Sequence, residues 1–221
     1  MNDAKLLTAG LGGLGLELSE KQHNKFLAYK ELLLHWNKTY NLVSRNDSHR
    51  VLERHILDSL SVLRYVEGMR VADIGSGAGL PGIPLSIAFE EKKFTLVDRS
   101  LRKVRFLRHA ILDLKLKNVA VESWNLNGSN PSRQNASSEG SAVARDVEFD
   151  TVVARAVSDP QSVWTMARPL VRASGRLVIQ CGLNTVLPES FSGAKIVEDT
   201  TLTISNSGAQ HRALVLKKCE G

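Results

Sequence analysis

Residues 70–98, RVADIGSGAGLPGIPLSIAFEEKKFTLVD, indicate the fold class of this chain. A short apolar run at 71–74 leads into a loop with glycines at positions 75, 77, 79 and 82, and a second apolar run ends at Asp98. Pro84 suits the first turn of a helix, where a missing backbone N–H costs nothing. The stretch therefore predicts a strand, a glycine loop, a helix and a second strand, which is half of a nucleotide-binding α/β fold.

The register of the glycines indicates which nucleotide the loop would hold. Residues 77–82 formally spell the dinucleotide pattern G-x-G-x-x-G, but the glycine that directly follows the strand is Gly75, which puts Leu80 at the third-glycine position. Read from the strand, D-I-G-S-G-A-G has Asp73 two places before Gly75, which resembles the S-adenosylmethionine loop of class I methyltransferases. A dehydrogenase loop and a turn without a ligand are the alternatives. Asp98 is placed to accept hydrogen bonds from ribose hydroxyls, unless it is simply a solvated carboxylate.

The bulk composition limits the protein class. A chain of 221 residues fits one domain with an extension, and its net charge of +6 with a pI near 9.4 leans toward polyanionic partners. No apolar run approaches the roughly 20 residues that span a bilayer. The two cysteines, Cys181 and Cys219, are too few for a disulfide framework or a zinc site. We expect a cytoplasmic monomer without metal or membrane contact.

The segment before the glycine loop reads as two helices. Ser19 and Gln22 form a capping box, and an apolar stripe runs from there to Trp36, after which residues 35–47 should break the helix. A second helix should start at residue 47 or 48 and continue through residue 66. Residues 1–18 show no clear period.

Several cap side chains have structural and functional interpretations. His55 and Asp58 share a helix face, and we expect a hydrogen-bonded pair that fixes the cap on the domain. Trp36, Asn37 and Asn41 favour a packed helix end over a base-stacking platform.

The rest of the chain alternates helices and strands. A helix that Ser100 can cap should bury a stripe of apolar side chains and expose Arg102, Arg105 and His109, and Asp159-Pro160 should start a later helix. Further strands are expected at 119–121, 151–154, 176–180, 202–204 and 213–216. This order predicts a class I methyltransferase (Rossmann-like) fold with a mostly parallel seven-stranded sheet and an antiparallel C-terminal edge.

The predicted organisation is one compact domain in two parts. Residues 1–68 form an N-terminal helical cap, and residues 69–221 form the Rossmann-like core. Within the core, the Gly/Ser/Asn-rich stretch 127–146 reads as a mobile surface insertion.

Five strings together resemble one family. HWNKTYNL (35–42), RHILDSL (54–60), DIGSGAGLPGIPL (73–85), KVRFL (103–107) and ARAV (154–157) occur in this order. They are similar to the bacterial small-subunit rRNA guanine-N7 methyltransferases, RsmG or GidB, over roughly residues 15–217. The resemblance implies methyl transfer from S-adenosylmethionine to N7 of guanine 527 in 16S rRNA of the small ribosomal subunit.

The resemblance also assigns site residues. It implies cofactor contacts for the loop and for four later positions, namely Gly75, Gly77, Gly79, Leu80, Asp98, Leu126, Asn127 and Arg155. Arg155 and Asp73 are the candidates for positioning the reactants, although Asp73 can instead hold the loop backbone. Arg99, Arg102, Lys103 and Arg105 are candidates for RNA phosphate contacts, or a basic helix face that is only solvated.

Three departures from the family pattern stand out. Asn127 replaces a usual glutamate, Cys181 stands where a lysine is common, and Gln210-His211 replaces a common Glu-Arg pair. Cys181 itself reads as a small buried residue. These departures leave open a non-catalytic ribosome-assembly factor, and a methyltransferase for a small molecule or protein is the other alternative.

Overall fold

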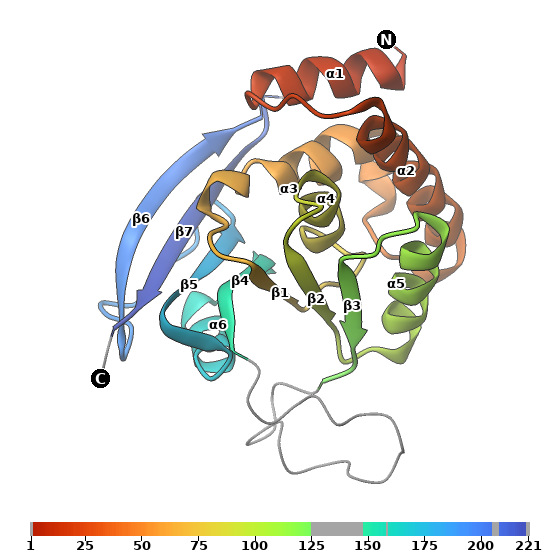
Figure 1. Cartoon of the computed structure of the whole chain (residues 1–221). Coiled ribbons are helices and arrows are strands. Elements are labelled where there is room, and N and C mark those ends of the chain that lie inside the picture. Colours follow the sequence, from red (N-terminus) through yellow and green to blue (C-terminus); the bar gives the residue numbers. More distant parts are fainter. Residues whose placement is uncertain (1, 125–147, 158, 205–207, 220–221) are drawn as a thin grey trace, which may run out of the picture.

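The computed structural model of the chain describes residues 2–124, 148–157, 159–204 and 208–219. Within these ranges, seven strands form one sheet in the order β3–β2–β1–β4–β5–β7–β6 (Figure 1). The first five strands pair in parallel, whereas β7 runs antiparallel to both β5 and β6. The strands are β1 (Arg70–Ile74), β2 (Lys93–Val97), β3 (Val119–Glu122), β4 (Phe149–Val157), β5 (Val171–Cys181), β6 (Ala194–Thr203) and β7 (Gln210–Lys218). The predicted sheet is confirmed.

Strand β6 is longer than its sequence indicates. An apolar run predicted a strand only at 202–204, but the strand begins at Ala194. Its earlier residues are mostly exposed because β6 is an edge strand that pairs with β7 alone. Polar residues are tolerated there, so no apolar run marks the start.

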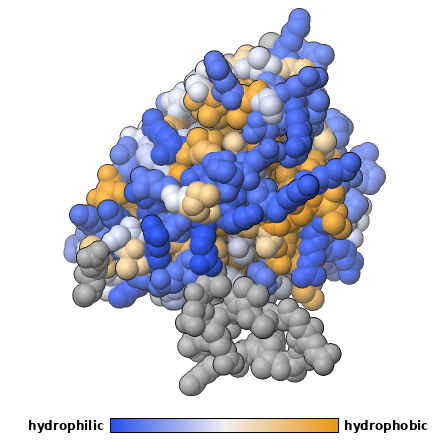
Figure 2. Space-filling view, viewed as in Figure 1, coloured by the Kyte–Doolittle hydropathy of each residue, from blue (hydrophilic) through white to orange (hydrophobic). Residues whose placement is uncertain are grey.

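A separate hydrophobic core covers each face of the sheet. Helices α2 (Glu20–Tyr40), α4 (Gly82–Ala88) and α5 (Leu101–Asp113) lie over one face, and α6 (Pro160–Ala167) lies over the other. The predicted stripe of α5 is confirmed: Val104, Leu107 and Leu114 are buried and Ile111 is half-buried. Arg102, Arg105 and His109 are exposed. Figure 2 shows hydrophilic side chains over much of the visible face, with hydrophobic areas between them.

The first helix of the cap, α1 (Asp3–Gly13), has no clear sequence signal. It forms because Leu7 and Leu11 are buried in the same core as α2 and the sheet. Gly10 allows close approach, since a Cβ there would lie 2.2 Å from Leu57 Cδ1.

Helix α2 begins at the predicted capping box but ends later than expected. The Ser19 hydroxyl accepts from the Gln22 amide, as predicted. The helix then continues to Tyr40, because Trp36 stacks on Tyr40 at 5.1 Å between ring centroids and lies edge-on to Phe106. The expected break near Trp36 was therefore wrong, although Trp36 does belong to a packed helix end.

The expected second helix over 47–66 is not a regular α-helix. It divides into a 3₁₀ helix η1 (Arg45–Arg50), a π-helix η2 (Leu52–Leu57), a short α3 (Asp58–Leu60) and a 3₁₀ turn η3 (Leu63–Tyr65). The hydroxyls of Ser59 and Ser61 donate to the carbonyls of His55 and Asp58, both at 2.6 Å. Side chains that take helix carbonyls in this way disturb regular helix geometry.

Candidate functional site

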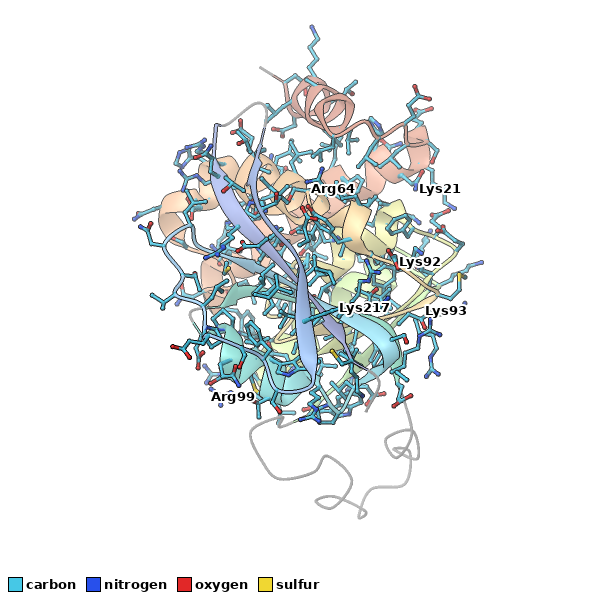
Figure 3. The ribbon with its side chains drawn as sticks, turned by 90° about the vertical axis from the view of Figure 1, so that its left-hand side faces the viewer. Lys21, Arg64, Lys92, Lys93, Arg99 and Lys217 are labelled. Atoms are coloured by element: carbon cyan, nitrogen blue, oxygen red, sulfur yellow. The ribbon has the colours of Figure 1, made fainter. Side chains whose placement is uncertain are left out.

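The site lies at the carboxyl edge of the sheet, where β1 and β4 are neighbours. From β1 the chain proceeds to β2 and β3 on one side, whereas β4 and β5 lie on the other, so the strand order reverses between β1 and β4. Ligands of open α/β sheets bind outside the carboxyl ends at such a switch point. In Figure 3, Lys93 at the start of β2 and Arg99 just beyond its end lie on opposite sides of the molecule.

Two of the loop glycines face open space. Gly75 has φ +69°, and a Cβ built there would meet nothing within 4 Å. A Cβ at Gly77 would lie no closer than 3.7 Å to the nearest atom, the Gly75 carbonyl oxygen. By contrast, a Cβ on Gly79 would lie 2.4 Å from Ile83 Cδ1, and Leu80 is buried. The loop thus leaves room for a ligand at Gly75 and Gly77, while Gly79 is required by packing.

Asp98 closes one side of the loop. Its Oδ2 accepts from the Gly77 amide at 2.9 Å and its Oδ1 accepts from the Ser100 amide at 2.8 Å. The side chain is buried, so the alternative of a solvated carboxylate was wrong. Each carboxylate oxygen can accept two hydrogen bonds, so Asp98 keeps acceptor capacity for a ligand. Ser100 stands at the N-cap of α5 but makes no side-chain cap bond.

Asp73 lies beneath the loop and is fully buried. Its Oδ2 accepts from the Gly82 amide at 2.9 Å, so it holds the loop backbone as one of its two predicted roles requires. Its Oδ1 is buried without a hydrogen-bond partner among the described residues. Burial, more than any other cause, raises the pKa of Asp73 to about 7.

Ser76, which no sequence signal marked, joins the loop to β2. The Ser76 hydroxyl donates to the Asp73 carbonyl at 2.7 Å and accepts from the Val97 amide at 3.0 Å. Its backbone amide also donates to the Val97 carbonyl at 3.0 Å. Serine at this loop position therefore fixes the loop against the neighbouring strand.

Arg155 stands at the end of β4, across the switch point from the glycine loop. Its guanidinium lies 2.7 Å from Asp58 Oδ2, donates to the Arg54 carbonyl at 2.7 Å, and lies 3.3 Å from His55 Nδ1. His55 and Asp58 do attach the cap to the sheet, but through Arg155 rather than through the expected bond to each other. Burial, and after it Arg155, lowers the pKa of His55 to about 4.

Of the departures near the C-terminus, His211 belongs to the same polar cluster. His211 Nδ1 lies 2.7 Å from Asp58 Oδ1. The two carboxylate oxygens of Asp58 therefore face different side chains, His211 at Oδ1 and Arg155 at Oδ2. The Gln180 side chain donates to the Asp58 carbonyl at 2.8 Å. Cys181 is buried at the end of β5, as predicted for a small core residue, and Gln210 donates to Thr203 Oγ1 at 3.2 Å. Leu126, Asn127 and the stretch 127–146 lie outside the described residues.

Of the four basic candidates, Lys103 reaches Asp98, and the other three lie near it in the chain. Lys103 Nζ lies 3.7 Å from Asp98 Oδ2 and 3.8 Å from the position of a Cβ at Gly77. Arg99, Arg102 and Arg105 are exposed beside it on the turn before α5 and on its first turns. Their placement next to the loop is compatible with contacts to a polyanion that enters the site, and a solvated basic face remains the alternative.

Comparison with known proteins decides the family. The family model of GidB, described as "rRNA small subunit methyltransferase G", matches residues 22–186 of this chain. A protein of Hahella chejuensis named ribosomal RNA small subunit methyltransferase G is 34% identical, covering 99% of this chain and 95% of its own length. This chain belongs to the GidB family. A GidB protein of the same name from Nitrosococcus oceani is 36% identical, over 96% of this chain and 94% of its own length.

Solved structures share the fold of this GidB chain. One is an S-adenosylmethionine-dependent methyltransferase from Aquifex aeolicus, with a TM-score of 0.52 and 19% identity over 79% of this chain and 95% of that one. Another, a point mutant of MtNAS in complex with S-adenosylmethionine, has a TM-score of 0.56 and 16% identity over 89% of this chain and 73% of that one. Among the described residues, no helix is long and apolar enough to cross a bilayer.

Proposed function

We propose that this chain transfers the methyl group of S-adenosylmethionine to N7 of guanine 527 in the 16S rRNA of the small ribosomal subunit. The observation that carries the proposal is the open loop at Gly75 and Gly77, which stands beside the buried Asp98 at the switch point. Relatives that match nearly the whole chain are named for methylation of small-subunit rRNA, and the guanine N7 follows from the resemblance of the five strings.

The chemistry asks the protein for positioning rather than for proton transfer. Neutral guanine carries a free lone pair on N7, and the sulfonium donor supplies an already activated methyl group. Correct orientation of two reactants can contribute on the order of 7–11 kcal/mol to lowering a barrier. The methylated base is cationic, so a nearby carboxylate or carbonyl stabilises the developing charge. No nucleophile or acid/base pair is required.

Particular residues fit the parts of the donor. Gly75 and Gly77 leave space for its close approach, and Asp98 retains acceptor capacity for ribose hydroxyls. Arg155 stands on the opposite side of the switch point, at the end of β4, and would border the donor there. In the proposed complex, the flipped-out guanine would enter from the same edge, as base-modifying enzymes require.

Tritium transfer tests the proposal. The purified protein is incubated with labelled S-adenosylmethionine and with 16S rRNA or 30S subunits, the RNA being taken from cells that lack this gene. Primer extension after borohydride and aniline cleavage then maps the label. We expect one labelled guanine N7, at position 527. Cofactor binding without transfer would favour an RNA-binding assembly role, and label found only in the proteins of the 30S subunit would contradict the rRNA substrate.

A matched pair of variants tests the ribose contact. Asp98→Ala should weaken binding of S-adenosylmethionine about tenfold or more, which corresponds to about 1.4 kcal/mol. Asp113→Ala removes an exposed carboxylate at the other end of the following helix and should leave the dissociation constant unchanged. Equal affinities for both variants would remove Asp98 from the donor site.

The salt dependence of RNA binding tests the basic residues. A double Arg102→Gln, Arg105→Gln variant should reduce the slope of log K against log salt by roughly 1.4–1.8, because each phosphate contact contributes about 0.7–0.9. The control carries Lys5→Gln and Lys195→Gln, two exposed lysines on α1 and β6. Both elements lie away from α5 in Figure 1. If both double variants bind with the same slope, the helix face is only solvated.

A further inference from the structure

Cap helix α2 reaches into the glycine loop through Tyr29. The Tyr29 hydroxyl donates to the Ala78 carbonyl at 2.6 Å, and both residues are buried. Ala78 stands between Gly77 and Gly79, in the middle of the loop. Burial, and after it the nearby Asp73, raises the pKa of Tyr29 above its ordinary value, so the phenol stays protonated and remains a donor.

The same helix also holds the far end of α4. The Gln22 side chain donates to the carbonyls of Ile87 and Ala88 at 2.8 and 3.2 Å, and Lys25 pairs with Glu90 at 2.6 Å. Gln22 and Tyr29 are two turns apart on α2, a separation of about 10 Å along the helix axis. Helix α2 is therefore attached to both ends of the unit formed by the glycine loop and α4.

Tyr29 holds the glycine loop on the side that faces the cap. Ser76 and Asp98 fix the loop from the direction of β2. A loop rich in glycines with positive φ can adopt many backbone conformations when it is unrestrained. Each carbonyl that is held by a hydrogen bond reduces the number of conformations that the loop can adopt. The Ala78 carbonyl is buried, and loss of its donor would leave it poorly satisfied in the observed conformation.

We propose that Tyr29 is a positioning residue for the methyl-donor loop. Its hydroxyl fixes the Ala78 carbonyl and thereby the loop conformation that receives the donor, so that the cap takes part in cofactor binding. The proposal rests on the proposed function, because it assumes that this loop binds S-adenosylmethionine.

The test compares Tyr29→Phe with Lys25→Ala. Tyr29→Phe keeps the ring and its packing and removes only the hydroxyl, whereas Lys25→Ala removes a contact of the same helix at the end of α4 remote from the loop. We expect Tyr29→Phe to raise the dissociation constant of S-adenosylmethionine about fivefold, in line with the loss of one hydrogen bond. Lys25→Ala should leave it within about twofold.

Kinetics separate positioning from a merely structural role. In the rRNA transfer assay, Tyr29→Phe should raise KM for S-adenosylmethionine and leave KM for the RNA unchanged. A structural role alone would lower the unfolding midpoint of Tyr29→Phe and leave both KM values unchanged. If Tyr29→Phe folds and binds the donor with wild-type affinity, the proposal about Tyr29 is overturned. The proposed function would still stand, provided that the wild-type protein binds the donor and transfers its methyl group. A wild-type protein that does not bind the donor would overturn both.

A measurement on the unaltered protein covers the case in which Tyr29→Phe does not fold. Coupling between two sites is reciprocal, so donor binding must in turn stabilise the contact made by Tyr29. Addition of S-adenosylmethionine should slow amide hydrogen exchange in residues 26–33 of α2 as well as in the loop, and leave α6 unchanged. Slowing confined to the loop would contradict the proposed role of Tyr29.

Discussion

Asp58→Asn should be strongly destabilising, because it removes the charge from a buried ion pair. The side chains of Asp58 and Arg155 are 12% and 16% exposed, and their charged atoms lie 2.7 Å apart. Removal of one partner from a buried pair typically costs about 3–5 kcal/mol. Arg155 keeps its bond to the Arg54 carbonyl, so we expect the lower end, about 3 kcal/mol.

Urea unfolding at neutral pH measures this cost. With an m-value of about 2 kcal/mol per molar, a loss of about 3 kcal/mol lowers the midpoint by about 1.5 M. The control is Glu90→Gln, which breaks the pair with Lys25, in which Glu90 is 45% exposed. Such exposed pairs contribute about 0–1 kcal/mol.

A double-mutant cycle with Arg155→Met assigns the effect to the pair itself. If Asp58 acts through Arg155, the loss in the double variant should fall well short of the sum of the single losses, by at least about 1 kcal/mol. Additive losses, or a loss for Asp58→Asn no larger than that for Glu90→Gln, would refute the reasoning. The partner on the other oxygen of Asp58, His211, remains in place in both backgrounds and does not enter the coupling term.

The remaining predictions concern titration and packing. Between pH 4 and 6.5 the unfolded chain binds more protons at His55 than the folded one does, so stability should rise with pH over this window, and His55→Gln should flatten the rise in urea midpoints. Asp73 has the opposite effect, because its pKa is raised from 3.8 to about 7. Its contribution to folding stability is full at low pH and is lost as the pH rises toward 7. Asp73→Asn should abolish that loss of stability. Gly82→Ala should destabilise by about 1–3 kcal/mol in denaturant melts, because its Cβ would lie 2.3 Å from Leu96 Cδ2, whereas Gly12→Ala meets nothing within 4 Å and should be neutral or mildly stabilising. Cys181→Lys should lower the melting temperature sharply and not raise RNA affinity, since it would bury a charge, while Cys181→Ala should fold.

The central strands and the glycine loop were predictable because their signals are local. The run 70–98 contains two buried strands, the glycine loop between them and Asp98, all within one stretch of chain. A buried parallel strand must be apolar on both faces, which an apolar run indicates directly. The part of the candidate site that β1 and β2 form could therefore be predicted from this one stretch of sequence.

The cap could not be predicted in the same way, because its conformation depends on distant contacts. The glycine-rich α1 has low helix propensity and forms because Gly10 permits close packing on Leu57. The pairing of Asp58 with Arg155 and His211 requires strands β4 and β7 to be in place. Periodicity correctly placed His55 and Asp58 on one face, but it could not indicate that their common partner comes from the sheet.

The positions of these cap contacts give the buried ion pair a functional explanation. A buried pair is often no more stabilising than apolar residues of the same volume, so stability alone does not account for Asp58 and Arg155. The pair holds the Arg155 guanidinium at the end of β4, beside the switch point where we propose that the donor binds. Tyr29 restricts the opposite edge through Ala78. In the proposed reaction, which depends on the alignment of donor and acceptor rather than on an acid or a base, fixing both edges would lower the cost of reaching the reactive geometry. Substitutions that break one of these two contacts, at Asp58 or at Tyr29, should therefore alter the methyl transfer itself.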